Sequence, residues 1–246
     1  MPTITSRHNP LFKRVREAIR EHADEIVIEG SKSVDDAIAG GWKPIIVLRR
    51  DVDLSSELFD ALAETKTPQG VIALFERPPQ ANLFVRSDTI VVALDGVQDP
   101  GNVGTIVRLA AAFDAGAIAL LPGCADPYSP KSIRASAGAI LTVPVANVTI
   151  DNLTWPLFVT AADGSPDDPP ARGAIIVFGS EGQGVSPEIA RRAKSLAIRT
   201  SGRVESLNVA ASAAILLSRS FELRGADVSS AQSSGRDVRS PRGGTP

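Results

Sequence analysis

Three short segments of the chain combine glycines with amide and carboxylate side chains, a combination that suits ligand binding or catalysis. The first is LDGVQDPGNVGTIVR, residues 94–108, in which Asn102 precedes Arg108 by six positions. An apolar run, a glycine-bearing turn and a helix start form a common site for anionic groups. The dinucleotide pattern G-x-G-x-x-G and the P-loop Gly-Lys-Ser/Thr are both missing here. The local pattern by itself favours a helix cap at Asn102 and a surface charge at Arg108.

The second segment is VFGSEGQGVSP, residues 177–187, where three glycines surround Glu181 directly after an apolar run. Glycine permits positive φ angles and close approach of the backbone to a ligand. A ligand-binding loop is therefore favoured over a plain turn. Ser186 and Pro187 then predict the cap and the first residue of the next helix.

The third segment is RVESLNV, residues 203–209, and it leads into a stretch rich in small residues at 210–217. Ser206 and Asn208 both belong to the residue types that cap helices. A helix with so many small side chains packs closely against backbone or against a partner. The residues alone leave both kinds of packing open.

The composition excludes several functional classes. The 246 residues are 43% hydrophobic and 22% charged, as in ordinary globular proteins. One cysteine (Cys124) and two histidines (His8 and His22) exclude a cysteine-rich zinc site and argue against a histidine-based metal centre or triad. Aromatic residues, at 4%, are too few for base stacking to be the main binding device. Since the net charge is −2, any nucleic-acid surface must be local.

The sequence shows no sign of membrane insertion or secretion. Its apolar stretches fall short of the roughly 18 residues that span a bilayer. The basic N-terminus is not followed by the apolar region of a signal peptide. We therefore expect a cytoplasmic protein.

Apolar periodicity divides the chain into two α/β modules, at 1–77 and 88–224, with a proline-bearing linker at 78–87 and a disordered tail at 225–246. In the first module a helix begins at Pro10 after an Asn9 cap. Further helices are expected at 31–39, 55–64, 103–114, 130–137, 186–192 and 207–223. Strands are expected at 25–29, 44–48, 70–75, 89–94, 117–121, 157–160, 174–178 and 196–198. The alternation in the second module predicts an α/β fold with a mostly parallel sheet.

Taken in order, the three segments resemble the SpoU (TrmH-type) branch of the SPOUT superfamily of RNA 2′-O-ribose methyltransferases. The resemblance rests on Asn102, Gly104 and Arg108, on GSEGxG at 179–184 and on SLNV at 206–209, and it covers about residues 88–223. At the N-terminus, ITSRHNP (4–10) and IEG (28–30) are similar to the family's accessory substrate-binding domain. That smaller α/β domain is similar in fold to ribosomal proteins that bind kinked RNA.

The resemblance implies a parallel-sheet catalytic domain whose C-terminal chain threads a loop to form a trefoil knot. It also implies S-adenosylmethionine as the cofactor, held largely by backbone groups, and no metal. By correspondence, the cofactor-binding residues are Thr160, Gly179, Glu181, Gly182, Gly184, Ile198, Leu207 and Asn208.

The resemblance further implies that Arg108 activates the ribose 2′-hydroxyl. A free guanidinium keeps its proton at neutral pH and is a poor base. Arg108 therefore acts either as a base that the site helps to deprotonate or as an electrostatic stabiliser. Asn102 is expected to position Arg108 or the ribose. Glu181, Ser206 and Asn208 are expected to order the surrounding loops.

RNA and a second copy of the chain are the implied partners. Residues 1–20 carry five Lys or Arg and one Glu, which suits either a solvated helix face or phosphate contacts. The segment SIRASAGA at 132–139 is similar to a family loop near the RNA. The expected RNA contacts are Arg7, Lys13, Arg16, Arg20 and Arg134. The tail arginines Arg236, Arg239 and Arg242 suit either an RNA-contacting arm or an inert solubilising end, and the inert end is favoured. The family works as a homodimer.

The sequence favours 2′-O-methylation of large-subunit ribosomal RNA, because the accessory domain is less usual in the simpler tRNA enzymes of this branch. The alternatives are a tRNA 2′-O-methyltransferase, a methylase that protects the ribosome from an antibiotic, or a non-catalytic RNA-binding protein on the same scaffold. A non-catalytic protein predicts loss of motif residues, and all five expected catalytic residues are present.

Overall fold

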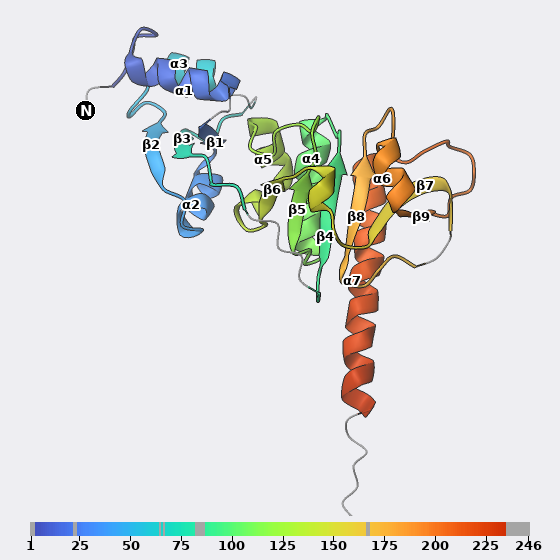
Figure 1. The fold of residues 1–246 in the computed structure, drawn as a ribbon. Coiled ribbons are helices and arrows are strands. Elements are labelled where there is room, and N and C mark those ends of the chain that lie inside the picture. The colour runs from blue at the N-terminus through green and yellow to red at the C-terminus, as the bar shows by residue number, and fades with distance from the viewer. Residues whose placement is uncertain are drawn as a thin grey trace, which may run out of the picture.

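The computed structural model describes residues 3–21, 24–63, 65, 67–81, 87–165 and 168–234. They form two units, an N-terminal one and a larger one that begins near residue 87 (Figure 1). His22, linker residues 82–86 and the three tail arginines lie outside the described residues.

The N-terminal unit is a three-stranded sheet with helices on both faces (Figure 1). Asn9 caps the first helix as expected, because its Oδ1 accepts a hydrogen bond of 2.9 Å from Leu11 N. The strand order is β1-β3-β2 and both pairings are antiparallel. Its elements are α1 (Pro10–Glu21), β1 (Glu25–Glu29), α2 (Ser31–Ala39), β2 (Pro44–Arg49), α3 (Ser56–Leu62) and β3 (Val71–Glu76).

Side-chain alternation along β1 divides the N-terminal unit into two hydrophobic layers. Val27 packs with Phe12 of α1 and Phe59 of α3. Ile26 and Ile28 point to the other face and belong to a core that continues into the larger unit. The two units are therefore joined through buried side chains as well as through the chain itself.

The larger unit is built on a six-stranded sheet in the order β6-β5-β4-β8-β7-β9, with every pairing parallel. This confirms the predicted α/β fold with a parallel sheet. Its elements are β4 (Ile90–Asp95), α4 (Pro100–Ala112), β5 (Ala117–Leu120), α5 (Pro130–Ser136), β6 (Val145–Asn147), β7 (Leu157–Ser165), β8 (Ala174–Gly179), α6 (Pro187–Arg192), β9 (Lys194–Leu196) and α7 (Val209–Ser234). Single 3-10 turns lie at Ala139–Leu141 and Ile150–Asn152. The knotted path of the chain stays a prediction.

Helices cover both faces of the large sheet. Val92 and Leu94 of β4 face a core shared with α4 and α7, whereas Val91 and Ala93 face Ile189 of α6. The short edge strand β6 was not predicted, and the last strand begins two residues earlier than predicted. Strands of three residues carry too little periodicity to be located from sequence.

The last helix, α7, is longer than expected and projects from the domain (Figure 1). The expectation of disorder from residue 225 is wrong for residues 225–234, which are helical. Arg224 anchors this helix on the end of α4: its guanidinium donates to the Phe113 and Asp114 carbonyl oxygens and to the Asp114 carboxylate, at 3.4, 3.1 and 2.9 Å. Because an anchored helix elongates without a new nucleation cost, it continues past the Ser/Gly-rich boundary. None of the helices in the described ranges is long and apolar enough to cross a membrane.

Helices α4 and α5 touch through their backbones at Gly104. A Cβ atom at this position would lie 2.2 Å from the carbonyl oxygen of Ser132 and 2.7 Å from the Cβ of Ala135. Only glycine permits this contact, which fixes the spacing of the two helices.

We expect Gly104→Ala to lower the free energy of unfolding by about 1–3 kcal/mol, because the added methyl group forces the helices apart. Urea denaturation followed by circular dichroism measures this change. Gly182→Ala is the matched control: its Cβ would meet no atom within 4 Å, so the expected change is below about 0.5 kcal/mol. Equal stability of Gly104→Ala and the unaltered chain would contradict the proposed constraint.

Candidate active site

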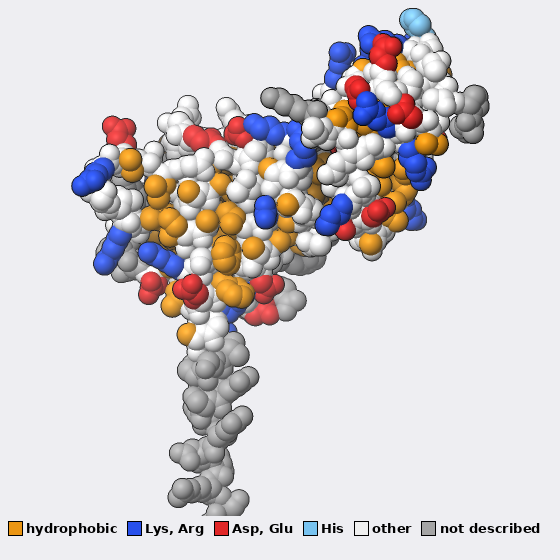
Figure 2. Space-filling view, turned by 180° about the vertical axis from the view of Figure 1, so that it is seen from behind, with side chains coloured by type: hydrophobic (Ala, Val, Ile, Leu, Met, Phe, Trp, Pro, Cys, Tyr) orange, Lys and Arg blue, Asp and Glu red, His pale blue; other side chains and the backbone are white. Residues whose placement is uncertain are grey.

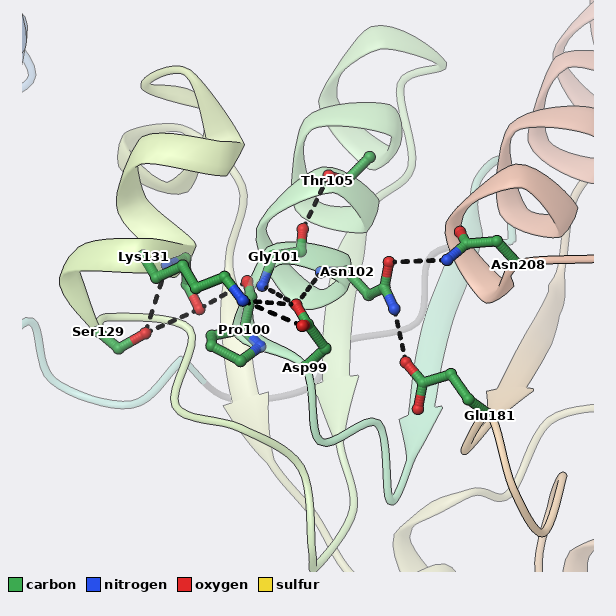
Figure 3. Close-up of polar contacts among 10 residues, drawn as sticks. Asp99, Pro100, Gly101, Asn102, Thr105, Ser129, Lys131, Glu181 and Asn208 are labelled. Carbon is green, nitrogen blue, oxygen red and sulfur yellow. Dashed lines mark hydrogen bonds and ion pairs between the residues drawn. The ribbon is translucent and has the colours of Figure 1, made fainter. Parts of the chain in front are cut away.

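The site is organised around the side-chain amide of Asn102 (Figure 3). Its Nδ2 donates to Glu181 Oε1 at 2.5 Å, and its Oδ1 accepts from Asn208 Nδ2 at 3.1 Å. These contacts join the start of α4, the loop after β8 and the start of α7. Three of the five expected catalytic residues are therefore brought together.

Asp99 fixes the start of α4. Its Oδ1 accepts from the backbone N–H groups of Gly101 and Asn102, at 2.5 and 3.1 Å, and Lys131 Nζ lies 3.0 Å from its Oδ2 (Figure 3). The Lys131 ammonium and these backbone donors lower the pKa of the Asp99 carboxyl. The expected helix cap at Asn102 is wrong, since Asp99 occupies the cap position. An Asp followed by Pro and Gly was a usable signal for this cap.

Asn208 has two structural roles. Its Oδ1 caps α7 by accepting from Ala210 N and Ala211 N at 2.9 and 3.2 Å. Its Nδ2 is thereby directed at Asn102. The cap expected from sequence is confirmed for Asn208, and the same amide also serves the site.

The glycine-rich loop folds back on the end of β8 and presents Glu181. Ser180 and Gly184 exchange backbone hydrogen bonds of 3.0 and 2.9 Å across this loop. A Cβ at Gly179 would lie 2.1 Å from the Gly184 carbonyl carbon, so the turn requires glycine there. Ser186 is the cap and Pro187 the first residue of α6, as predicted, although the Ser186 side chain makes no capping hydrogen bond. Its backbone N–H instead donates to Asp95 Oδ2 at 2.6 Å.

The side chains of Arg108 and Ser206 are exposed and form no hydrogen bond or ion pair with the described residues. Six residues of α-helix turn by about 600°, so Arg108 projects roughly 120° around α4 from Asn102. The structure therefore does not join Arg108 to the cluster of Asn102, Glu181 and Asn208. The catalytic roles of Arg108 and Ser206 stay predictions.

Two of the expected cofactor residues lie where parallel strands end, the usual ligand-binding edge of an α/β sheet, and a third lies within a strand. Thr160 lies in β7 opposite Leu196 of β9, Gly179 ends β8, and Ile198 follows β9. Residues 199–207 form no backbone–backbone hydrogen bond with any described residue. Their polar backbone groups are therefore available to water or to a ligand. A Cβ at Gly182 or Gly184 would meet no atom within 4 Å, and Leu207 is half-buried. This arrangement fits a cofactor held mainly by backbone groups.

The expected RNA contacts lie on two surfaces. Lys13, Arg16 and Arg20 are exposed along α1, and the Arg16 guanidinium lies 5.7 Å from the Phe12 ring centre. Arg7 forms an exposed ion pair of 3.1 Å with Glu57. Arg134 belongs to α5 of the larger unit and lines a small cavity between the two units. The role of these side chains in RNA binding stays a prediction.

The described residues include no cluster of three His, Cys, Asp or Glu side chains that could hold a metal ion. Cys124 is half-buried, and its burial raises the pKa of the thiol.

Residues 89–218 match the SpoU rRNA methylase family. The chain is 31% identical to an uncharacterized tRNA/rRNA methyltransferase of Synechocystis sp., over 87% of this chain and 92% of the relative. It is also 31% identical to the 23S rRNA guanosine 2′-O-methyltransferase RlmP of Bacillus subtilis, over 84% and 91% of the two chains. An AdoMet-bound rRNA methyltransferase from Sinorhizobium meliloti superposes with a TM-score of 0.79 at 26% identity, over 90% and 97% of the two chains.

The chain belongs to the SpoU rRNA methylase family. It is therefore of the class of RNA methyltransferases that take their methyl group from S-adenosylmethionine, and the family, enzyme class and methyl donor expected from the sequence are confirmed.

Two variants separate the roles of Asn208. Asn208→Asp keeps an oxygen that caps α7 but loses the N–H donor to Asn102, so stability is expected to change by less than about 0.5 kcal/mol. Asn208→Ala loses both contacts and is expected to cost about 1 kcal/mol. Methyl transfer falls in both variants, because Asn102 and Glu181 lose their fixed orientation. Urea denaturation and transfer of labelled methyl groups measure the two effects. Full activity of Asn208→Asp would show that the amide donor is dispensable.

Proposed function

We propose that this protein transfers a methyl group from S-adenosylmethionine to the 2′-hydroxyl of a ribose in large-subunit ribosomal RNA. The observation that carries the proposal is the Asn102 amide, hydrogen-bonded to both Glu181 and Asn208. This contact assembles the three segments that carry the family resemblance. The similarity to the Bacillus 23S rRNA 2′-O-methyltransferase supports the large ribosomal subunit as the source of the RNA.

The reaction exchanges one bond for another. The bound cofactor supplies a methyl group on a positively charged sulfur. The ribose oxygen forms a bond to that methyl carbon as the carbon–sulfur bond breaks, and the hydroxyl proton leaves to a base or to water. The products are a 2′-O-methylated ribose, S-adenosylhomocysteine and a proton.

The side chains of the site orient the reactants and stabilise charge. Asn102 and Asn208 fix Glu181 beside the proposed cofactor pocket. The exposed guanidinium of Arg108 is available to a ribose oxygen or a neighbouring phosphate. A cation placed where negative charge develops stabilises the transition state. Ser206, in the exposed segment before α7, is available to assist in holding the RNA or the cofactor.

The N-terminal unit is proposed to hold the RNA. The exposed cations of α1 and Arg134 of α5 are candidates for phosphate contacts, which position a nucleic acid without reading its sequence. A tRNA substrate remains the second candidate, because the Synechocystis relative carries the name tRNA/rRNA methyltransferase.

We further propose that the protein acts in the cytoplasm as a homodimer. The small-residue face of α7 does not supply the interface, because Ala210, Ala213, Leu216 and Leu217 are buried in the chain's own core. Exposed Phe221 and the hydrophobic side chains gathered on the face from which α7 projects (Figure 2) support a contact there instead.

Arg108→Ala tests the proposed reaction. Loss of the cation is expected to lower methyl transfer by about 100-fold or more, while the affinity for S-adenosylmethionine changes by less than about threefold. The assay follows tritiated methyl transfer to separated, unmodified large-subunit rRNA, small-subunit rRNA and tRNA. Nucleoside analysis places the label on the ribose.

Arg191→Ala, which removes another exposed arginine, is the matched control and is expected to keep near-normal transfer. Equal loss of transfer and cofactor binding in a folded Arg108→Ala variant would contradict its assigned role. Label in tRNA alone would favour the second candidate substrate. Failure of the unaltered chain to bind the cofactor or transfer methyl groups would favour a non-catalytic RNA-binding protein.

A further inference from the structure

Beside the shared hydrophobic core, an ion pair joins the two units at the point where the chain leaves the N-terminal sheet. Arg77 follows the last residue of β3, and its guanidinium meets the carboxylate of Asp126 in the larger unit. The Nη1–Oδ2 and Nη2–Oδ1 distances are 2.9 and 2.7 Å. Both side chains are about one-quarter exposed, at 27% and 25%. A bidentate arginine–carboxylate ion pair fixes the relative orientation of the two side chains as well as the distance between them.

Aromatic side chains from both units support this ion pair. The Arg77 guanidinium lies 4.8 Å from the ring centre of Tyr128, a buried residue of the larger unit. Tyr128 packs in turn on Trp42 of the N-terminal unit, with ring centres 6.1 Å apart, and Trp42 packs edge-on against Phe75. We call Arg77, Asp126, Tyr128 and Trp42 the interdomain clasp.

Ser132 connects the interdomain clasp to the start of α4. The fully buried Ser132 hydroxyl oxygen lies 2.8 Å from the carbonyl oxygen of Asp126 and 3.0 Å from that of Pro100. Pro100 is the first residue of α4, two positions before Asn102. Gly104 presses α4 onto the Ser132 backbone one turn further along. The loop that carries Asp126 and the start of α4 are therefore one packed assembly.

We propose that Arg77 is a positioning residue for methyl transfer, and that the interdomain clasp holds the RNA-bearing N-terminal unit in a fixed orientation to the start of α4. This role rests on the proposed function. Bound RNA spans both units, from the α1 cations to the site at Asn102. Any rotation at residue 77 moves the target ribose relative to the cofactor. A displacement of about 1 Å can cost a catalyst about 100-fold in rate.

A purely structural role makes a different prediction. The N-terminal unit has its own hydrophobic layer between α1, α3 and the sheet, which does not include the clasp. Loss of the ion pair therefore leaves the RNA-binding surface of α1 intact. A positioning role predicts a lower rate of methyl transfer in the RNA-bound complex with little change in RNA affinity. Loss of folding instead lowers both the rate and the RNA affinity.

The experiment uses the full chain and a double-mutant cycle of Arg77→Gln and Asp126→Asn. In the second variant the side-chain amide oxygen can still accept the backbone hydrogen bond that Asp126 Oδ1 receives from Tyr128 N. Single-turnover methyl transfer is measured at saturating RNA, beside RNA and cofactor affinities. Acrylamide quenching of Trp42 in a Trp155→Phe background reports opening of the clasp, since the chain has two tryptophans.

We expect each single substitution to lower the single-turnover rate by about tenfold or more, with affinities within about twofold and increased quenching of Trp42. The double variant is expected to be no slower than either single variant, because one substitution already opens the clasp. Arg50→Gln is the matched control: it removes the 2.8 Å Arg50–Asp60 ion pair inside the N-terminal unit and leaves the rate unchanged.

Three outcomes overturn the positioning role: an unchanged rate with Trp42 exposed, unchanged quenching of Trp42, or an equal loss of rate in Arg50→Gln. Absence of transfer by the unaltered chain would overturn the proposed function itself, and with it the role that rests on it.

Discussion

One amide side chain, that of Asn102, holds together three segments that are distant in sequence. An amide can bridge a carboxylate and a second amide only in one orientation, with its NH₂ toward Glu181 and its oxygen toward Asn208. A flip of the group would break both contacts. The loop after β8 and the first turn of α7 are therefore ordered by the same group. Everything that the site does in the proposed reaction depends on where α4 places this residue.

The start of α4 is held by contacts from its cap, from α5 and from the loop before α5. Asp99 caps the helix and forms an ion pair with Lys131. The Ser132 hydroxyl donates to the backbone carbonyl oxygens of Asp126 and Pro100. Gly104 lets the backbones of α4 and α5 come into contact. Helix α5 also borders β1 of the N-terminal unit. A continuous series of packed groups thus runs from the proposed RNA-binding unit to Asn102. Because packed interiors have little free volume, a shift of one group in this series displaces its neighbours.

The sequence was most informative where the signal is local. Continuous apolar runs located the buried strands β4 and β8, since parallel strands covered on both faces need no polar alternation. The antiparallel pairing of the N-terminal sheet and the position of β6 depend on contacts between distant residues, and no local pattern encodes them. Asn102, Glu181 and Asn208 were found through the family resemblance. Lys131 was missed as part of the site because its partner Asp99 lies about 30 residues away in the chain, and Ser132 was noted only as the start of a segment similar to a family loop near the RNA.

Charge alone cannot place RNA on this protein. The chain has a net charge of −2, and cations of the N-terminal unit such as Arg7, Arg14 and Arg50 are paired with carboxylates. Lys13, Arg16 and Arg20 of α1 stay exposed and can neutralise phosphates, but each such contact weakens as salt rises. In the proposed reaction, the shape of the protein and the fixed orientation of the two units must therefore help to position the RNA, as a strongly basic surface does in other RNA-binding proteins. A bidentate ion pair packed against aromatic rings fixes the orientation of the two units better than a flexible linker does.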